Sequence, residues 1–181
     1  MNKTSPSVAI RKAVGGDAEA LSALAIRTFT DAFGASNNPA DVALYLDTHY
    51  RVEAIARDLA DVSIVTLLAG DAPFAGFAQL KPSDAGGFDA AGFGVQRPAK
   101  LSRLYVDEPW HGRGVAPQLL GALEDAARAS ECDAMWLTVW EHNARAIAFY
   151  SKCGFKVCGK TDFLLGTDPQ RDFVMAIRLA T

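Results

Sequence analysis

The sequence predicts an α+β (mixed α/β) fold, in which helices pack against one mixed β-sheet. Three observations predict it. Short apolar runs such as Val62–Ala69 and Ala134–Trp140 have the length and composition of strands. Apolar residues at helical spacing follow Ala18 and Ala116. Turn residues between these runs place hairpins on either side of a strand–helix–strand unit, and this order of elements produces a mixed sheet.

Length and composition are those of one globular domain. The chain has 181 residues, of which half are hydrophobic by type and 22% are charged. We therefore expect a single domain over residues 1–181 with a sizeable core. The net charge of −3 gives no electrostatic support for nucleic-acid binding. No apolar run reaches the roughly 18 residues of a membrane span, so no membrane association is expected.

The cysteines and the N-terminus indicate a reduced, cytoplasmic setting. Cys132, Cys153 and Cys158 are odd in number, and no pair has CxxC spacing. The opening segment, MNKTSPSVAIRKAVGGD, lacks a long apolar run, so no signal peptide is expected. The histidines are scattered along the chain, and we expect no metal site.

The first half of the chain is expected to contain one short strand and three helical segments: Val8–Ala13, a helix from Ala18 to near Gly34, Asp41–Thr48 and Val52–Leu59. Asp17 precedes the first helix as a candidate N-cap. Gly34 is a candidate C-cap glycine.

The second half begins with a predicted antiparallel hairpin, Val62–Ala69 and Phe74–Lys81, joined by a Gly-Asp-Ala-Pro turn. Pro82–Pro98 is a loop that is either a lid or a plain insertion. The later elements are predicted as follows: strand Leu101–Val106, a helix from about Ala116, strand Ala134–Trp140, helix Asn143–Lys152, and strands at Phe155–Lys160 and Arg171–Leu179.

A glycine-bearing turn, HGRGVA, connects the strand at Leu101 to the helix at Ala116. Gly112 and Gly114 lack Cβ atoms, so the backbone can approach a ligand closely. The turn opens a helix, whose free N–H groups and dipole favour an anion such as a pyrophosphate. A tight strand-to-helix connection is the alternative. The dinucleotide and Walker patterns are both absent.

A polar face follows on the helix after the next strand. Asn143, Ala146, Ile147 and Tyr150 fall on one side of it. An amide and a phenol with small residues between them can line a groove. For Tyr150 alone, half-buried packing is the alternative.

Together the turn and this face resemble the GCN5-related N-acetyltransferases, the GNAT family. Gly114 and Ala116 match the loop motif [QR]xxGx[GA], with His111 where the family usually has Gln or Arg. The order Asn143, Ala146, Phe149-Tyr150 and Gly154-Phe155 is similar to the family's following helix–strand motif. The resemblance implies a central, mostly antiparallel twisted sheet flanked by helices, with a cofactor gap between strands 4 and 5. It also implies an enzyme that uses acetyl-CoA as co-substrate.

A narrower likeness is to bacterial Pai-type spermidine/spermine N-acetyltransferases. The residues that carry it are Thr28–Phe33, Asn38-Pro39, Tyr45-Leu46, Arg103–Val106, Trp136–Asn143, Phe163, Gly166, Asp172 and Met175. Substrate range varies in that subgroup, so the likeness supports polyamine acceptors only loosely.

The resemblance assigns roles to particular residues. The expected cofactor-binding residues are Leu104, Tyr105, Val106, His111, Gly112, Arg113, Gly114, Val115, Ala116, Asn143 and Ala146. Tyr150 is the expected general acid for the leaving thiolate. Relatives often carry Glu on the strand where Ser102 stands, so the general base is unassigned, and Glu141 is the substitute to test first.

Substrate contacts are expected from Phe29, Asp31, Phe33 and Tyr45, with core packing as the alternative for the aromatic residues and a plain helix-surface role for Asp31. The predicted function is transfer of an acetyl group to a primary amine, a polyamine or similar small molecule. A protein N-terminal or lysine acetyltransferase and a non-catalytic acyl-CoA-binding protein are the alternatives. A homodimer is the assembly to test.

Overall fold

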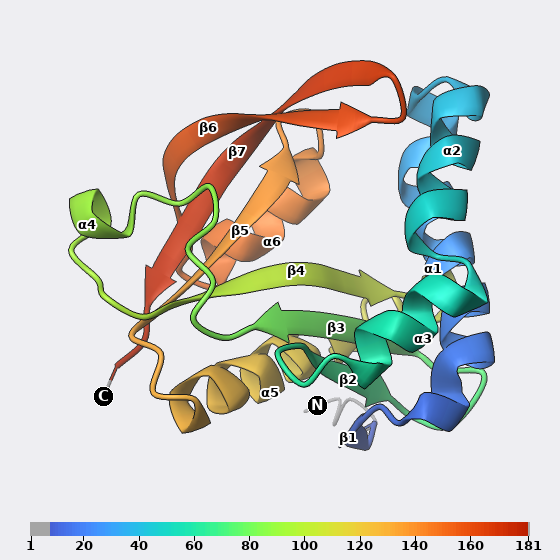
Figure 1. The fold of residues 1–181 in the computed structure, drawn as a ribbon, viewed down its shortest axis with the longest axis horizontal. Helices are drawn as coiled ribbons and strands as arrows, with labels where there is room; N and C mark the ends of the chain where they lie inside the picture. The colour runs from blue at the N-terminus through green and yellow to red at the C-terminus, as the bar shows by residue number, and fades with distance from the viewer. Residues whose placement is uncertain (1–7, 181) are drawn as a thin grey trace, which may run out of the picture.

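A computed structural model describes residues 8–180 of the chain (Figure 1). These residues form a seven-stranded sheet in the order β1-β2-β3-β4-β5-β7-β6. The strands are β1 Ile10–Lys12, β2 Val65–Ala69, β3 Gly76–Lys81, β4 Pro98–Val106, β5 Ala134–Trp140, β6 Lys156–Leu165 and β7 Asp168–Arg178. The helices are α1 Ala18–Phe33, α2 Pro39–His49, α3 Val52–Ala60, α4 Ala90–Phe93, α5 Val115–Ala129 and α6 Ala144–Lys152.

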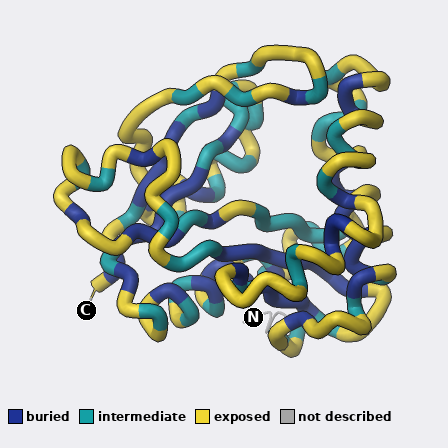
Figure 2. The backbone as a smooth tube through the Cα atoms, viewed as in Figure 1, coloured by how far each residue is buried: buried dark blue, intermediate teal, exposed yellow. Residues whose placement is uncertain are grey.

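Helices cover both faces of the sheet, and strand alternation supplies a core to each. Phe77 of β3 packs with Phe29 of α1 in one apolar cluster, whereas its neighbour Ala78 packs with Leu119 of α5 in the other. Figure 1 shows α1, α2 and α3 grouped together at one end of the sheet. Figure 2 shows that buried residues run along the central strands, while the outer turns of these helices are exposed. Among the described residues, no helix has the length and apolar character needed to cross a membrane.

The sheet is antiparallel at every junction except the one between β4 and β5. Those two strands are parallel and pair only where Pro98–Lys100 meets Ala134–Trp136. Beyond Lys100 no described strand pairs with β4 on that side. The predicted fold class and the predicted gap between strands 4 and 5 are therefore confirmed.

A β-bulge in β4 lies beside this gap. Gln79 of β3 is opposite Arg103, but Leu80 is opposite Leu101, so Ser102 has no residue opposite it. Ser102 is exposed, although it lies on the central strand of the sheet. Solvent therefore reaches the middle of β4 at the point where β5 has separated from it.

Most of the predicted elements are confirmed, with shifted ends. β6 and β7 extend the two C-terminal strands into one long hairpin closed at Gly166 and Thr167. The segment Pro82–Pro98 contains α4 and is a packed insertion. Phe88 is stacked on Trp136 with 5.5 Å between ring centroids, and the Trp136 indole N–H donates to the carbonyl of Asp84 at 2.6 Å.

The predicted positions of both caps of α1 are confirmed, but neither cap has the geometry that its residue type usually supplies. Asp17 directly precedes α1 but makes no side-chain cap. Its carboxylate instead accepts from the Val14 N–H at 2.8 Å and pairs with Arg11 at 2.7 Å, because the chain makes a 3₁₀ turn before the helix. Gly34 follows α1 in right-handed helical conformation, with φ of −60°, so it is not a left-handed C-cap.

Candidate active site

The turn before α5 leaves backbone N–H groups without helical partners. Gly112 and Gly114 adopt φ values of 73° and 79°, a left-handed conformation that other residues reach only with strain. Gln118 donates the first hydrogen bond of α5 to the carbonyl of Gly114, at 3.3 Å. The N–H groups of Val115 and Ala116 precede that bond, and they point out of the helix N-terminus, where an anion is favoured.

His111 joins this turn to the end of β4. Its Nε2 lies 2.8 Å from the carbonyl oxygen of Val106. The residue that departs from the family motif thus has a definite structural role through its side chain. The Arg113 guanidinium lies over the Trp110 ring, 5.5 Å from its centroid, and the Arg113 N–H points to the Trp110 carbonyl at 3.4 Å. Cofactor binding by Arg113 remains a prediction.

A pocket of about 780 Å³ extends from the turn through the gap between β4 and β5 to the N-terminal helix α1. This volume suits a cofactor-sized ligand. Nearly all of the predicted cofactor-binding residues line it: Leu104, Tyr105, Val106, His111, Gly112, Gly114, Val115, Ala116, Asn143 and Ala146. Arg113 is the predicted member that does not line it. The chemistry of the lining fits acetyl-CoA, because free N–H groups lie at one end and a free strand edge lies along the path.

Tyr150 presents its phenol to the same pocket. Its side chain is 7% exposed and packs edge-on against Phe149 and Phe155, with centroid distances of 5.2 and 5.6 Å. Burial raises the pKa of the phenol, and the neighbouring Cys153 adds to the shift. The hydroxyl therefore keeps its proton and can act as a donor.

Of the other residues predicted on this face of α6, Asn143 caps the helix and Ile147 packs in the core. Asn143 caps the helix, because its Oδ1 accepts from the Ala146 N–H at 3.1 Å. Its amide N–H groups remain for a ligand. Ile147 does not line the pocket but packs into the core below α5 and α6, which corrects the prediction of a shared groove face.

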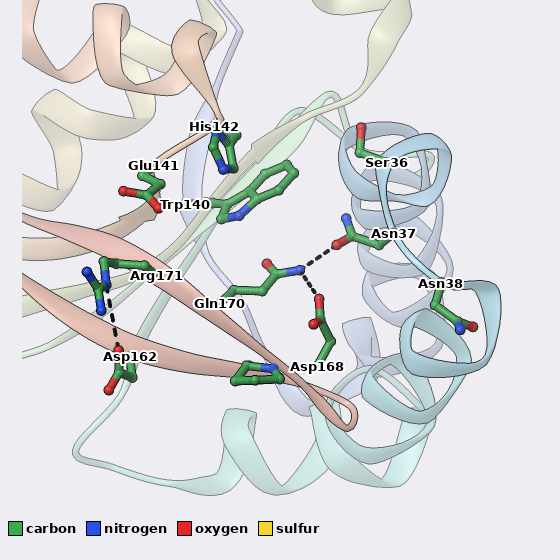
Figure 3. Close-up of a pocket in the computed structure, with 11 residues that line it drawn as sticks. Ser36, Asn37, Asn38, Trp140, Glu141, His142, Asp162, Asp168, Gln170 and Arg171 are labelled. Atoms are coloured by element: carbon green, nitrogen blue, oxygen red, sulfur yellow. Dashed lines mark hydrogen bonds and ion pairs between the residues drawn. The ribbon is translucent and has the colours of Figure 1, made fainter.

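The structure does not bring Glu141 together with Tyr150. Glu141 lines a separate polar hollow of about 610 Å³ beside Trp140, Gln170 and Arg171 (Figure 3). Its carboxylate is 3.2 Å from the Lys160 ammonium. A catalytic role for Glu141 stays a prediction, and this ion pair gives it a structural alternative.

Of the four predicted substrate contacts, two line the main pocket and two pack in the core. Asp31 and Phe33 line the main pocket from α1. Phe29 is 3% exposed and stacks on Tyr45 with 4.7 Å between ring centroids, so these two rings join α1 to α2 in the core. Asp31 is exposed. The nearby cation, Arg27, is hydrogen-bonded to another carboxylate, that of Asp107, at 2.9 Å.

Sequence patterns gave no role to two charged residues with largely buried side chains, Arg103 and Asp172, although both lie in the segments that carry the narrower likeness. Arg103 points its guanidinium at Asp58 and Gln79, at 2.6 and 2.7 Å, and lies 4.8 Å from the centre of the Tyr50 ring. Asp172 is 6% exposed, and one of its carboxylate oxygens has no hydrogen-bond partner among the described residues. A charged residue inside an alternating apolar strand is the signal that could have found both.

Comparisons with known proteins agree with this geometry. The acetyltransferase (GNAT) family model matches residues 21–155. An uncharacterised N-acetyltransferase of Lactobacillus delbrueckii subsp. lactis is 30% identical over 154 residues, which are 84% of this chain and 87% of that protein. The spermine/spermidine N(1)-acetyltransferase of Bacillus subtilis is 34% identical over 64 residues, covering 35% of this chain and 42% of that one.

Among solved structures, the chain is similar to the PaiA N-acetyltransferase of Thermoplasma acidophilum in complex with coenzyme A. The TM-score is 0.75 at 24% identity, and the match covers 95% of this chain and 99% of the other. The fold, the family model and the full-length relative all lead to one assignment. This chain belongs to the GNAT family of N-acetyltransferases, which confirms the predicted enzyme class and its acetyl-CoA co-substrate.

Proposed function

We propose that this N-acetyltransferase transfers the acetyl group of acetyl-CoA to a primary amine of a small aliphatic molecule of the polyamine class. One observation carries the proposal: a single pocket joins the free N–H groups at α5, the phenol of Tyr150 and the carboxylate of Asp31, which forms no ion pair within residues 8–180. The same pocket therefore contains donors for the cofactor, a general acid and a carboxylate that can bind a cationic acceptor.

The cofactor supplies an acetyl group activated as a thioester. The N–H groups of Val115 and Ala116 bind its pyrophosphate, because they are the unpaired donors of a helix N-terminus. The unpaired edge of β4 around Leu104 and Tyr105 offers backbone groups to the pantetheine amides. The Val106 carbonyl is less available, since His111 already contacts it.

Tyr150 acts on the leaving group. Its phenol keeps its proton because burial raises its pKa, so it can protonate the thiolate as the amine attacks. The ring is fixed between Phe149 and Phe155, which limits the directions in which the hydroxyl can point.

The acceptor class rests on charge and on one distant relative. Asp31 places an exposed carboxylate at the α1 side of the pocket, beside the apolar ring of Phe33. An aliphatic chain with more than one ammonium group suits this pair, because one nitrogen can react while another remains charged near Asp31. The Bacillus subtilis relative carries a polyamine name, and its match over 64 residues supports the same class.

A panel of acceptors tests the proposal. Purified protein with acetyl-CoA is offered spermidine, spermine, a short diamine, a monoamine, and peptides with a free N-terminus or a lysine. CoA thiol release and acetylated product are both measured. We expect polyamines to be acetylated with the highest kcat/KM, and equimolar thiol and product. Turnover confined to the peptides would overturn the acceptor class and support a protein acetyltransferase.

A further inference from the structure

The sequence leaves one catalytic task without a residue. The amine that attacks the thioester must lose a proton, and the bulge residue Ser102 is a poor base. The acidic side chains near the acceptor side of the sheet differ in burial and in partner. Glu141 is paired with Lys160, Asp58 with Arg103 and Asp162 with Arg171. Asp31 and Glu108, which line the main pocket, are exposed.

Asp172 differs from all of these. It lies in β7, is 6% exposed, and has one carboxylate oxygen that no described group hydrogen-bonds. A buried carboxylate without a cation is costly, and in native proteins such groups are paired or serve a ligand. Its neighbours along β7 do not offset the cost, since Phe173 and Val174 are apolar and the adjacent Arg171 lies 3.9 Å from the carboxylate of Asp162.

The strand register places Asp172 on the sheet face of Trp140 and Gln170, which line the hollow beside Glu141, and Trp140 connects this face to the main pocket. Asp172 is directly opposite Trp140 of β5, so the two side chains share one face of the sheet. Gln170 points to the same face, where it donates to Asn37 at the turn between α1 and α2 (Figure 3). The Trp140 ring meets Phe33 edge-on at 6.2 Å, and Phe33 lines the main pocket.

We propose that Asp172 binds the ammonium group of the acceptor and takes its proton, so that it is the general base of the transfer. This inference rests on the proposed function. The N–H proton passes to the carboxylate, and the nitrogen lone pair forms the C–N bond to the acetyl carbonyl carbon. The C–S bond breaks, and the thiolate takes the proton of Tyr150. The acylated nitrogen then loses its second proton, which returns to Tyr150 through solvent, and Asp172 releases its own proton to solvent, so that one proton is released per acetyl group transferred.

The charged and polar groups around Asp172 support this role. Burial raises the pKa of the Asp172 carboxyl, the charge of Glu141 acts in the same direction, and the Thr138 hydroxyl opposes them. Tyr45 of α2 faces Asp172 as a neutral phenol, and the Lys160 ammonium of β6 is held by Glu141. A carboxylate with a raised pKa is a better proton acceptor, and the aromatic rings of Trp140 and Tyr45 favour a bound cation.

The first test is Asp172→Asn in the full-length protein, with Asp162→Asn as the matched control on the neighbouring strand and Glu141→Gln as the rival base. We expect Asp172→Asn to lower kcat/KM by about 10²–10⁴-fold for an alkylamine at neutral pH, and to leave the acetyl-CoA Kd unchanged. The acidic limb of the wild-type pH profile should disappear. An acceptor of low basicity, such as an alkoxyamine, should show a smaller loss because it is already neutral.

Equal activity of Asp172→Asn and wild type, or a full loss in Glu141→Gln alone, would overturn the assignment. So would an equal loss for the alkylamine and the alkoxyamine, which would indicate a structural role only.

The stability of the same variant gives a readout that needs no turnover. A raised carboxyl pKa means that the folded state holds the proton more tightly than the unfolded chain. Its stabilising contribution is present below the unfolded pKa and is lost as pH rises through the folded pKa. Asp172→Asn should therefore unfold at a higher temperature than wild type at neutral pH, and the difference should shrink in acid. A lower melting temperature at neutral pH would mean that the carboxylate has a stabilising partner, against the proposal.

These outcomes separate the inference from the proposed function. If wild type acetylates only peptides, the polyamine class fails, and the Asp172 comparison is made on the peptide amine. If wild type acetylates amines and Asp172→Asn does so equally well, the function stands and the base assignment fails.

Discussion

Removing one oxygen atom from Tyr150 should slow the transfer without disturbing the cofactor. In Tyr150→Phe the ring keeps its contacts with Phe149 and Phe155, because both involve the ring edges and not the hydroxyl. The variant should fold, with a loss of stability of at most about 1 kcal/mol. Loss of a general acid costs about 10²–10⁴-fold in kcat, which corresponds to about 3–5 kcal/mol of transition-state stabilisation.

The assay is kcat at saturating acetyl-CoA and amine, with the acetyl-CoA Kd measured separately by calorimetry. Tyr50→Phe is the matched control, because its phenol is buried outside the main pocket. We expect that control to keep most of its kcat. An unchanged kcat in Tyr150→Phe would refute the acid role. A fall in kcat matched by an equal loss of cofactor affinity would show that Tyr150 binds the cofactor without acting on the leaving group.

Further predictions concern the α5 turn, the acceptor contact and the core. Gly114→Ala places a Cβ on a residue with φ of 79°, at a cost of about 1–2 kcal/mol. The acetyl-CoA Kd, measured by calorimetry, should rise about 5–30-fold. An unchanged Kd would contradict cofactor binding at the α5 turn. Asp31→Asn should raise KM for spermidine by no more than about 5-fold and leave KM for a monoamine unchanged, since exposed ion pairs are weak; equal effects on both would contradict a second-ammonium contact. Asp58→Ala leaves the Arg103 guanidinium, which is 14% exposed, without its carboxylate, so urea unfolding should show a loss of about 2–3 kcal/mol. A loss of unfolding free energy close to zero would show that Gln79 and the Tyr50 ring are enough to stabilise the Arg103 guanidinium.

Sequence patterns predict the elements whose stability is local and miss contacts that join distant segments. Ala134–Trp140 was predicted with the bounds of β5 because it is apolar on both faces: Met135 and Leu137 pack in the cluster of Leu119, and Ala134 and Trp136 in a third cluster with Phe88. The turn at Gly166 was not predicted. There the Thr167 N–H and hydroxyl donate to Asp41, 126 residues away in the sequence, at 2.6 and 2.8 Å.

The site shows the same division. The cofactor residues lie on two short motifs and on the strand before the first, so their spacing was sufficient to predict them. The position of Glu141 was not predictable, because its partner Lys160 lies on β6, beyond β7. The sequence shows Asp172 as a charged residue in an apolar strand, but a role for it is indicated only by the structure, in which no described group bonds one of its oxygens. That environment depends on β5, β6, β7 and α2 together.

The central claim is that one pocket holds acetyl-CoA at the α5 turn and presents its acetyl group to an amine. A crystal structure of the protein with CoA and spermidine tests it most directly. We predict the pyrophosphate on the N–H groups of Val115 and Ala116, the thiol beside Tyr150, and an amine nitrogen on the α1 side of the gap between β4 and β5. A CoA molecule bound elsewhere, or an amine held only in the hollow beside Glu141, would contradict the claim.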